Sequence, residues 1–344
     1  MNNTSSLEMI STGRRQRRLR GMAVTSLLAL LACVLSVSML LLGNTIYSIS
    51  DVIRVLFGEQ VQGVSFAVNT IRLPRMLAGL LAGFAFGIGG CVFQTMLRNP
   101  LANPNVIGIT SGSSAGAVFC IIILQADRMV ISVASVVAGL ATVIVIYLLS
   151  RGKVFSIGRL ILIGIGLQAM LDAFISYFLL VGAQQDIPAA LRWLTGSLNG
   201  TQMHELPPLI FTVLFFTPIV ILLGKQLSIL ELGEQSAISL GVNTDKTRLG
   251  LILGSVCMIA IATATTGPIA FVAFLSGPIA KRLVGAGFLS LVPAGLVGVN
   301  LVLAADLLGQ FAFDYRYPAG IITAIIGAPY LIFLLIHMNR KGDL

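Results

Sequence analysis

Charged residues are scarce in this sequence: they make up 10 per cent of its 344 residues, whereas hydrophobic residues make up 56 per cent. Soluble proteins contain about 25 per cent charged residues, and the mean hydropathy of +0.97 indicates a membrane protein. No segment is long and polar enough to form a separate soluble domain. The composition therefore predicts a single polytopic membrane domain and excludes an ordinary soluble globular protein.

Residue types that bind metals or nucleotides are also few. The sequence has two histidines, no HExxH motif and no Cys-His or carboxylate cluster at metal-ligand spacing. Its four cysteines lie singly in apolar segments without CxxC spacing, so we interpret them as small buried side chains. A GxxxxGK[ST] motif is absent, so the chain does not bind ATP through a P-loop. We therefore expect no cofactor and no enzyme activity, and any energy source has to be a partner.

Lysine and arginine outnumber aspartate and glutamate by 22 to 13, which gives a net charge of +9. The basic residues are spread over short loops rather than gathered on one polar face, so nucleic-acid binding is not expected. Apolar runs of about 20 residues instead predict an all-α protein with about ten transmembrane helices. These helices are expected near residues 22–43, 71–97, 106–126, 128–150, 157–182, 206–224, 246–266, 268–284, 292–310 and 318–337.

The basic residues also predict the orientation of these helices. With the N-terminus inside, sixteen of the 22 Lys and Arg residues fall on the inner side and six on the outer side, which agrees with the positive-inside rule. Both termini are then cytoplasmic, with a basic segment at 1–21, the membrane domain at 22–338 and a tail at 339–344. Two Gly-Pro pairs interrupt the span at 268–284, so a broken or re-entrant helix is the alternative there.

The stretch from Arg72 to Gly116 predicts two apolar helices joined by the polar corner RNPLANP, in which Pro100 and Pro104 prevent helix continuation. Glycine recurs every four residues on both helices, at positions 79, 83 and 87 and at positions 108, 112 and 116. Such ladders of small residues allow helix backbones to approach closely in lipid. We therefore expect these two helices to pack tightly against each other as a membrane hairpin.

Three features of this stretch together resemble the FecCD-type permeases: RLPR at 72–75, the paired-proline corner and SGSS at 111–114. These permeases are the membrane subunits of bacterial ABC importers for iron-siderophores, haem and cobalamin. The resemblance covers nearly the whole chain and includes TGPIAFVAFLSGPIAKRLVG, which begins at Thr266. The family usually ends this segment in a Pro-His-x-x-Arg pattern, whereas Ile279 follows Pro278 here.

Two loops between the predicted spans carry further patterns. The outer loop contains RWLTGSLNG, which resembles the short outer helix that caps the pathway mouth in siderophore permeases. We expect this short helix near residues 190–200. The alternative is that Trp193 only anchors the loop at the membrane interface. The inner loop at 225–248 has an apolar face but offers glutamates, whereas a membrane-surface helix needs Lys and Arg. It resembles the paired coupling helices that contact the ATPase subunits, and an ordinary loop is the alternative. The resemblance assigns ATPase coupling to Glu231, Gly233, Glu234, Ala237 and Gly241.

Two carboxylates lie within predicted spans, where an ionised side chain costs about 2.5 to 3.5 kcal/mol on insertion scales. One of them, Asp172, follows Gln168 and precedes Ser176 at intervals of four, so the three residues share one helix face. In the resembling family this helix lines the translocation path, and burial of the stripe against a neighbouring helix is the alternative. The other, Asp306, lies near the outer end of its helix, where it reaches water or caps a neighbouring helix.

Three arginines are predicted on the outer side, where basic residues are otherwise few: Arg72, Arg75 and Arg316. The resemblance implies that they pair with acidic side chains of an extracytoplasmic siderophore-binding protein, using the bidentate geometry of arginine. For Arg72 and Arg75, snorkelling from a helix end is the alternative. On the inner side, Asn99 and Leu101 of the polar corner are candidates for constricting the mouth of the path.

The resemblance thus implies a permease that pairs with an identical or homologous chain in the bacterial cytoplasmic membrane, surrounded by membrane lipid. It would receive ferric siderophore from the external binding protein and be driven by two ATPase subunits through alternating access. Haem or cobalamin as cargo is the alternative within the same class. A secondary transporter that works alone is disfavoured, because the chain has no internal sequence repeat.

Overall fold

The computed structural model describes residues 3–100, 102, 108–150, 157–285 and 287–341, and these residues form helices without any strand. Eight helices in this part of the chain are long and apolar enough to cross a membrane. They are α1 (Asn3–Leu41), α3 (Leu73–Met96), α5 (Arg128–Ser150), α6 (Ile157–Val181), α8 (Pro207–Leu222), α11 (Thr244–Thr266), α13 (Leu291–Phe311) and α14 (Ala319–Lys341). The predicted all-helical, multi-pass membrane protein is confirmed.

Two of the ten predicted spans are short helices, α4 (Ile109–Ile122) and α12 (Val272–Val284), with 14 and 13 residues. At 1.5 Å per residue they extend only about 20 Å, less than the ~30 Å hydrocarbon core of a bilayer. A non-helical segment precedes α12, and in it Phe271 has a positive φ of 63°. The interruption of this span therefore lies at its beginning, after the first Gly-Pro pair.

The remaining helices are short and lie between the long ones. Near α1 and α3 are α2 (Ile49–Leu56) and the π-helix η1 (Ala67–Arg72), which runs directly into α3. The loop predicted to lie outside holds α7 (Ile187–Thr195) and the 3-10 helix η3 (Met203–Glu205). The loop predicted to lie inside holds α9 (Gly224–Leu230) and α10 (Glu234–Ser239).

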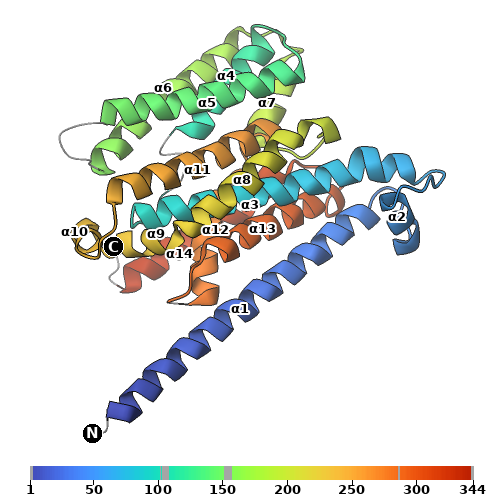
Figure 1. Ribbon diagram of the computed structural model, residues 1–344. Helices are drawn as coiled ribbons and strands as arrows, with labels where there is room; N and C mark the ends of the chain where they lie inside the picture. Colours follow the sequence, from blue (N-terminus) through green and yellow to red (C-terminus); the bar gives the residue numbers. More distant parts are fainter. Residues whose placement is uncertain (1–2, 101, 103–107, 151–156, 286, 342–344) are drawn as a thin grey trace.

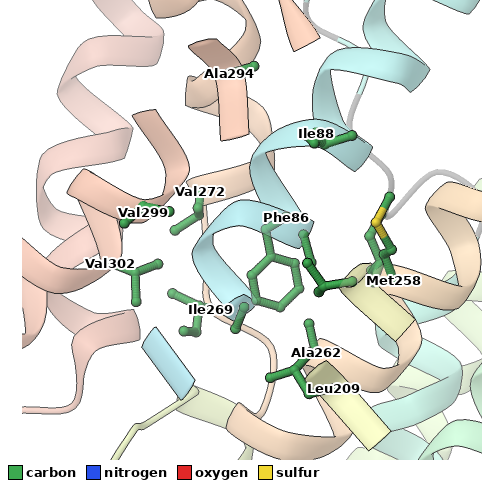
Figure 2. Close-up of a cluster of buried hydrophobic side chains, with 14 of the residues drawn as sticks. Phe86, Ile88, Leu209, Met258, Ala262, Ile269, Val272, Ala294, Val299 and Val302 are labelled. Carbon is green, nitrogen blue, oxygen red and sulfur yellow. The ribbon is translucent and has the colours of Figure 1, made fainter. Parts of the chain in front are cut away.

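Helix α3 is the centre of the fold and packs against α13, α11 and α12. Figure 2 shows Phe86 of α3 between side chains of α8 and α11 on one side and side chains of α12 and α13 on the other. Ile88 also lies in this cluster and is fully buried. The surrounding labelled side chains are Leu209, Met258, Ala262, Ile269, Val272, Ala294, Val299 and Val302.

The glycine ladders act as contacts between helices, but the predicted hairpin of α3 and α4 is wrong. A Cβ on Gly83 or Gly87 would overlap backbone atoms of α13, so the α3 ladder fits α13. A Cβ on Gly112 or Gly116 would overlap α5, so the α4 ladder fits α5 instead. Helices α3 and α4 are not among the main packing pairs. Small residues mark the face that permits close approach, but the opposing helix decides the partner.

The helices form layers, with α4, α5 and α6 on one side of the molecule and α1 on the opposite side (Figure 1). One end of the molecule brings together the basic part of α1, the end of α12, and α9 and α10. There, Nε of Arg20 donates to the carbonyl of Leu283 at 3.0 Å, and Lys281 pairs with Glu231 at 2.9 Å. The opposite end carries α2 and α7 (Figure 1).

Candidate functional site

The predicted polar stripe of Gln168, Asp172 and Ser176 lies on α6. This is the least enclosed of the long apolar helices, because only 11 per cent of an apolar stretch of 18 residues in it is buried. Helix α6 packs against α4 and α5 at the edge of the molecule, and its other face is open (Figure 1). Asp172 and Ser176 are exposed on it, whereas Gln168 is half-buried. No neighbouring helix of the described chain covers Asp172, and an ionised carboxylate that faces lipid is costly.

At the end of the molecule that holds them, α9 and α10 are joined by a tight turn at Gly233, whose φ of 113° favours glycine. Ala237 is fully buried against the protein and fixes one face of α10. Ile238 of α10 is 58 per cent exposed, and Leu232 just before the helix and Leu240 just after it are 67 and 63 per cent exposed. We call these three residues the α10 surface. Exposed apolar side chains clustered on a short helix outside the membrane spans are typical of a protein-docking surface.

The two glutamates of this region make ion pairs within the chain. Glu234 contacts Arg248 of α11 at 3.0 Å, and Glu231 contacts Lys281 of α12 at 2.9 Å. Because Arg248 is only 10 per cent exposed, the first pair links α10 firmly to the start of a spanning helix. Gly241, with a φ of 80°, ends the segment, and a Cβ there would meet open space.

At the opposite end of the molecule, Arg75 binds Asp306 of α13 in a bidentate ion pair. Nε and Nη2 of Arg75 each donate to a different carboxylate oxygen of Asp306 at 2.8 Å. Gln310 donates a further hydrogen bond to Asp306 at 2.8 Å, and Asn199 accepts one from Arg75. The side chain of Asp306 is 1 per cent exposed, so the expectation that it reaches water is wrong, and it instead ties α13 to the start of α3.

Arg72 also bonds within the chain. Its guanidinium donates to the carbonyls of Leu40, Leu41 and Thr45 at 2.7 to 2.8 Å, and it lies 4.3 Å from the ring centroid of Tyr47. It therefore caps the C-terminal end of α1, where helix carbonyls lack intrahelical partners. In this contact the guanidinium of Arg72 binds backbone carbonyls of its own chain, rather than a binding protein or the membrane interface.

Arg316 is exposed and donates to the side-chain oxygen of Asn44. It is thus the most accessible of the three predicted docking arginines. Asn99 is exposed in the polar corner after α3, where its N–H donates to the carbonyl of Gln94 at 3.0 Å. Leu101, the other candidate for the inner mouth, lies outside the described residues.

The sequence profile of the FecCD transport family matches residues 27–337. The chain belongs to the FecCD transport family. This FecCD protein is 36 per cent identical to the ferric enterobactin transport system permease protein FepG of Escherichia coli K12, over 94 per cent of this chain and 98 per cent of FepG. It is also 36 per cent identical to the Fe(3+)-citrate import system permease protein YfmE of Bacillus subtilis 168, over 97 and 100 per cent of the two chains.

A solved structure gives an independent comparison. An inward-facing conformation of a metal-chelate type ABC transporter superposes on this FecCD protein with a TM-score of 0.80 and 30 per cent identity. The match covers 92 per cent of this chain and 99 per cent of the other. The family and the fold together identify a multi-pass membrane permease subunit that has no catalytic role of its own.

Proposed function

We propose that this chain is the permease subunit of an ATP-driven importer that moves ferric siderophore from an external binding protein into the cytoplasm. The similarity to FepG and YfmE over nearly their whole lengths carries this proposal. Both relatives are named for ferric chelates, which favours ferric siderophore over haem or cobalamin as cargo. The protein would act in the bacterial cytoplasmic membrane.

In this proposal the eight long helices and the two shorter ones, α4 and α12, all belong to the membrane domain. Both termini are cytoplasmic, together with α9 and α10. Clustering of the basic residues of α1 with Lys281 at the α10 end supports this orientation, because cytoplasmic loops carry an excess of Lys and Arg. A helix of about 20 Å reaches across the core only where other protein or water surrounds its ends.

The exposed face of α6 supports a central path between two permease chains. A second copy, or a homologous chain, would bring its own α6 opposite the first, and Asp172 and Ser176 would then face water in the path. The carboxylate would stay hydrated, so its cost in lipid would be avoided. Asn99 and Leu101 would narrow the inner mouth of this path.

Two ATPase subunits would drive transport through the α10 surface. When nucleotide closes the ATPases, α9 and α10 would move with them. The ion pair of Glu234 with the buried Arg248 would carry this movement to α11, and the Lys281–Glu231 pair would carry it to α12. The path would then change the side to which it opens.

Uptake of radioactive ferric siderophore into vesicles tests this function, with the permease, its ATPase and its binding protein present. Ile238→Asp places a charge on the α10 surface and should abolish ATP-dependent uptake, whereas the control Ile238→Leu should retain it. Ile238 is 58 per cent exposed, so neither change disturbs the core. Uptake that needs no ATPase would instead favour a secondary transporter, and full uptake by Ile238→Asp would contradict docking at this surface.

A further inference from the structure

A cavity of about 830 Å³ lies apart from both the α6 stripe and the α10 surface. It opens between α5, α7 and α11, near η3 and the first residues of α8. Its position at the Arg128 end of α5 places it at one membrane interface. A cavity of this size is large enough for a drug-sized ligand, or for the headgroup of a lipid with part of one acyl chain.

The lining changes from polar to apolar along α5. The charged lining residues are Arg128, the first residue of α5, and Asp186, Arg192 and Glu205, from the N-cap of α7, from α7 itself and from η3. Beyond Ser132 the lining residues of α5 are apolar and continue to Val137, nine residues after Arg128, which is about 13 Å along the helix. Val133 and Val137 are 55 and 60 per cent exposed, so this part of the wall opens to the lipid side. The remaining deeper wall includes Ile131, Val136, Ile261 and Ala264. A cavity with a polar mouth and an apolar, laterally open body fits an amphipathic ligand.

The charges at the mouth are only partly matched within the protein. Arg128 donates to the carbonyl of Gly200 and lies 3.6 Å from Glu205, so these two opposite charges compensate each other. Asp186 accepts a hydrogen bond at 2.9 Å from the amide of Gln125, which is neutral. Among the described residues, the guanidinium of Arg192 has no hydrogen bond or ion pair. The mouth therefore presents one cation and one anion that a ligand can match.

We propose that this cavity binds a zwitterionic aminophospholipid, with phosphatidylethanolamine as its chemical type. Its phosphate contacts Arg192, with the side chains of His204 and Trp193 as further donors in the same lining. Its ammonium group, which has three N–H donors, contacts Asp186. One acyl chain lies along the apolar wall of α5. A free phosphate or a soluble zwitterion lacks a chain that could fill this apolar part.

Native mass spectrometry of the purified permease tests this site, with lipid supplied as phosphatidylethanolamine, phosphatidylglycerol or phosphatidylcholine. Phosphatidylethanolamine should be retained best, because phosphatidylglycerol lacks the ammonium and phosphatidylcholine lacks its N–H donors. Asp186→Asn keeps an acceptor for Gln125 and should remove the preference over phosphatidylcholine. Arg192→Gln should lower retention of all three lipids by about fivefold. Phosphatidylglycerol retained as well as phosphatidylethanolamine, or a preference unaffected by Asp186→Asn, would overturn the proposal.

A second pair of variants separates the cavity from the general lipid surface. Val137→Trp fills the apolar body of the cavity and should abolish preferential retention. Ile144→Trp, on the same helix and similarly exposed at 57 per cent, lies outside the cavity and should leave retention unchanged. Both positions are at the surface, so both variants should fold, which gel filtration checks. Equal retention by the two variants would mean that lipid binds elsewhere.

Discussion

The ion pair between Arg75 and Asp306 gives the sharpest test of the packing of α3 against α13. Asp306 receives three hydrogen bonds at 2.8 Å, two from Arg75 and one from Gln310. The side chains of Arg75 and Asp306 are 12 and 1 per cent exposed. The substitution Asp306→Asn keeps the shape of the side chain but removes its charge, so the guanidinium of Arg75 stays enclosed without a counter-charge.

The expected cost follows from this geometry. Removing one partner of a buried ion pair destabilises a protein by about 3 to 5 kcal/mol. The asparagine side chain would keep one acceptor oxygen for Arg75, so we expect the lower end of this range, about 3 kcal/mol. An unfolding entropy of about 2.1 cal/mol/K per residue, summed over the 344 residues, converts this loss of stability into a fall of about 4 °C in the midpoint temperature of unfolding.

Thermal unfolding in detergent measures this change, with Asp314→Asn as the matched control, because Asp314 is exposed on the same side. The double variant Arg75→Met/Asp306→Leu removes both charges and should lie within about 1 kcal/mol of the wild type. A double variant as unstable as Asp306→Asn, or an Asp306→Asn protein with the wild-type midpoint, would refute the reasoning. The double variant also tests docking: if Arg75 is purely structural, affinity for the external binding protein is retained.

Three further predictions concern the helix contact at Gly90, the proposed path and the docking face. Gly90→Ala should lower the free energy of unfolding by about 1 to 3 kcal/mol, because the added Cβ would overlap the carbonyl of Ala273. The control Gly166→Ala should not destabilise the protein in thermal unfolding, because a Cβ there meets open space. Asp172→Leu should lower ATP-dependent uptake while stability stays within about 0.5 kcal/mol, as for other exposed positions; unchanged uptake would remove Asp172 from the path. Arg316→Ala should weaken capture of the binding protein by up to about fivefold, more at low salt, and an unchanged affinity would count against docking there.

The helix boundaries were largely predictable, because the apolar runs and the polar breaks between them are local features of the sequence. The span expected at 128–150 matches α5, and the one at 157–182 ends one residue beyond α6. Helix α1 begins much earlier than the span expected at 22–43, because the polar segment before it continues the same helix. The π-helix η1 carries no pattern that distinguishes it from the beginning of α3.

Partners across long sequence separations were not predictable. Arg75 and Asp306 were each singled out for a different role, yet they are 231 positions apart and bind each other. The available signal was chemical: a carboxylate in a span needs a cation, and Arg75 is one of only six on the predicted outer side. Likewise, the ladder at Gly83 and Gly87 marked a close contact, but nothing local indicated that α13 rather than α4 would provide it.

The open face of α6 brings the sequence pattern and the structure into one argument. A carboxylate that faces lipid costs about 2.5 to 3.5 kcal/mol on insertion scales, yet Asp172 lies exposed on the helix with the least burial. In the described part of the chain no further element covers this face, because α6 packs only against α4 and α5 among its main partners. In the proposed pair of permeases, a second subunit that encloses water beside α6 would remove this cost and would form the path in the same step. Asp172, which is unfavourable for one chain in lipid, would therefore be suited to the wall of a water-filled path in the proposed pair.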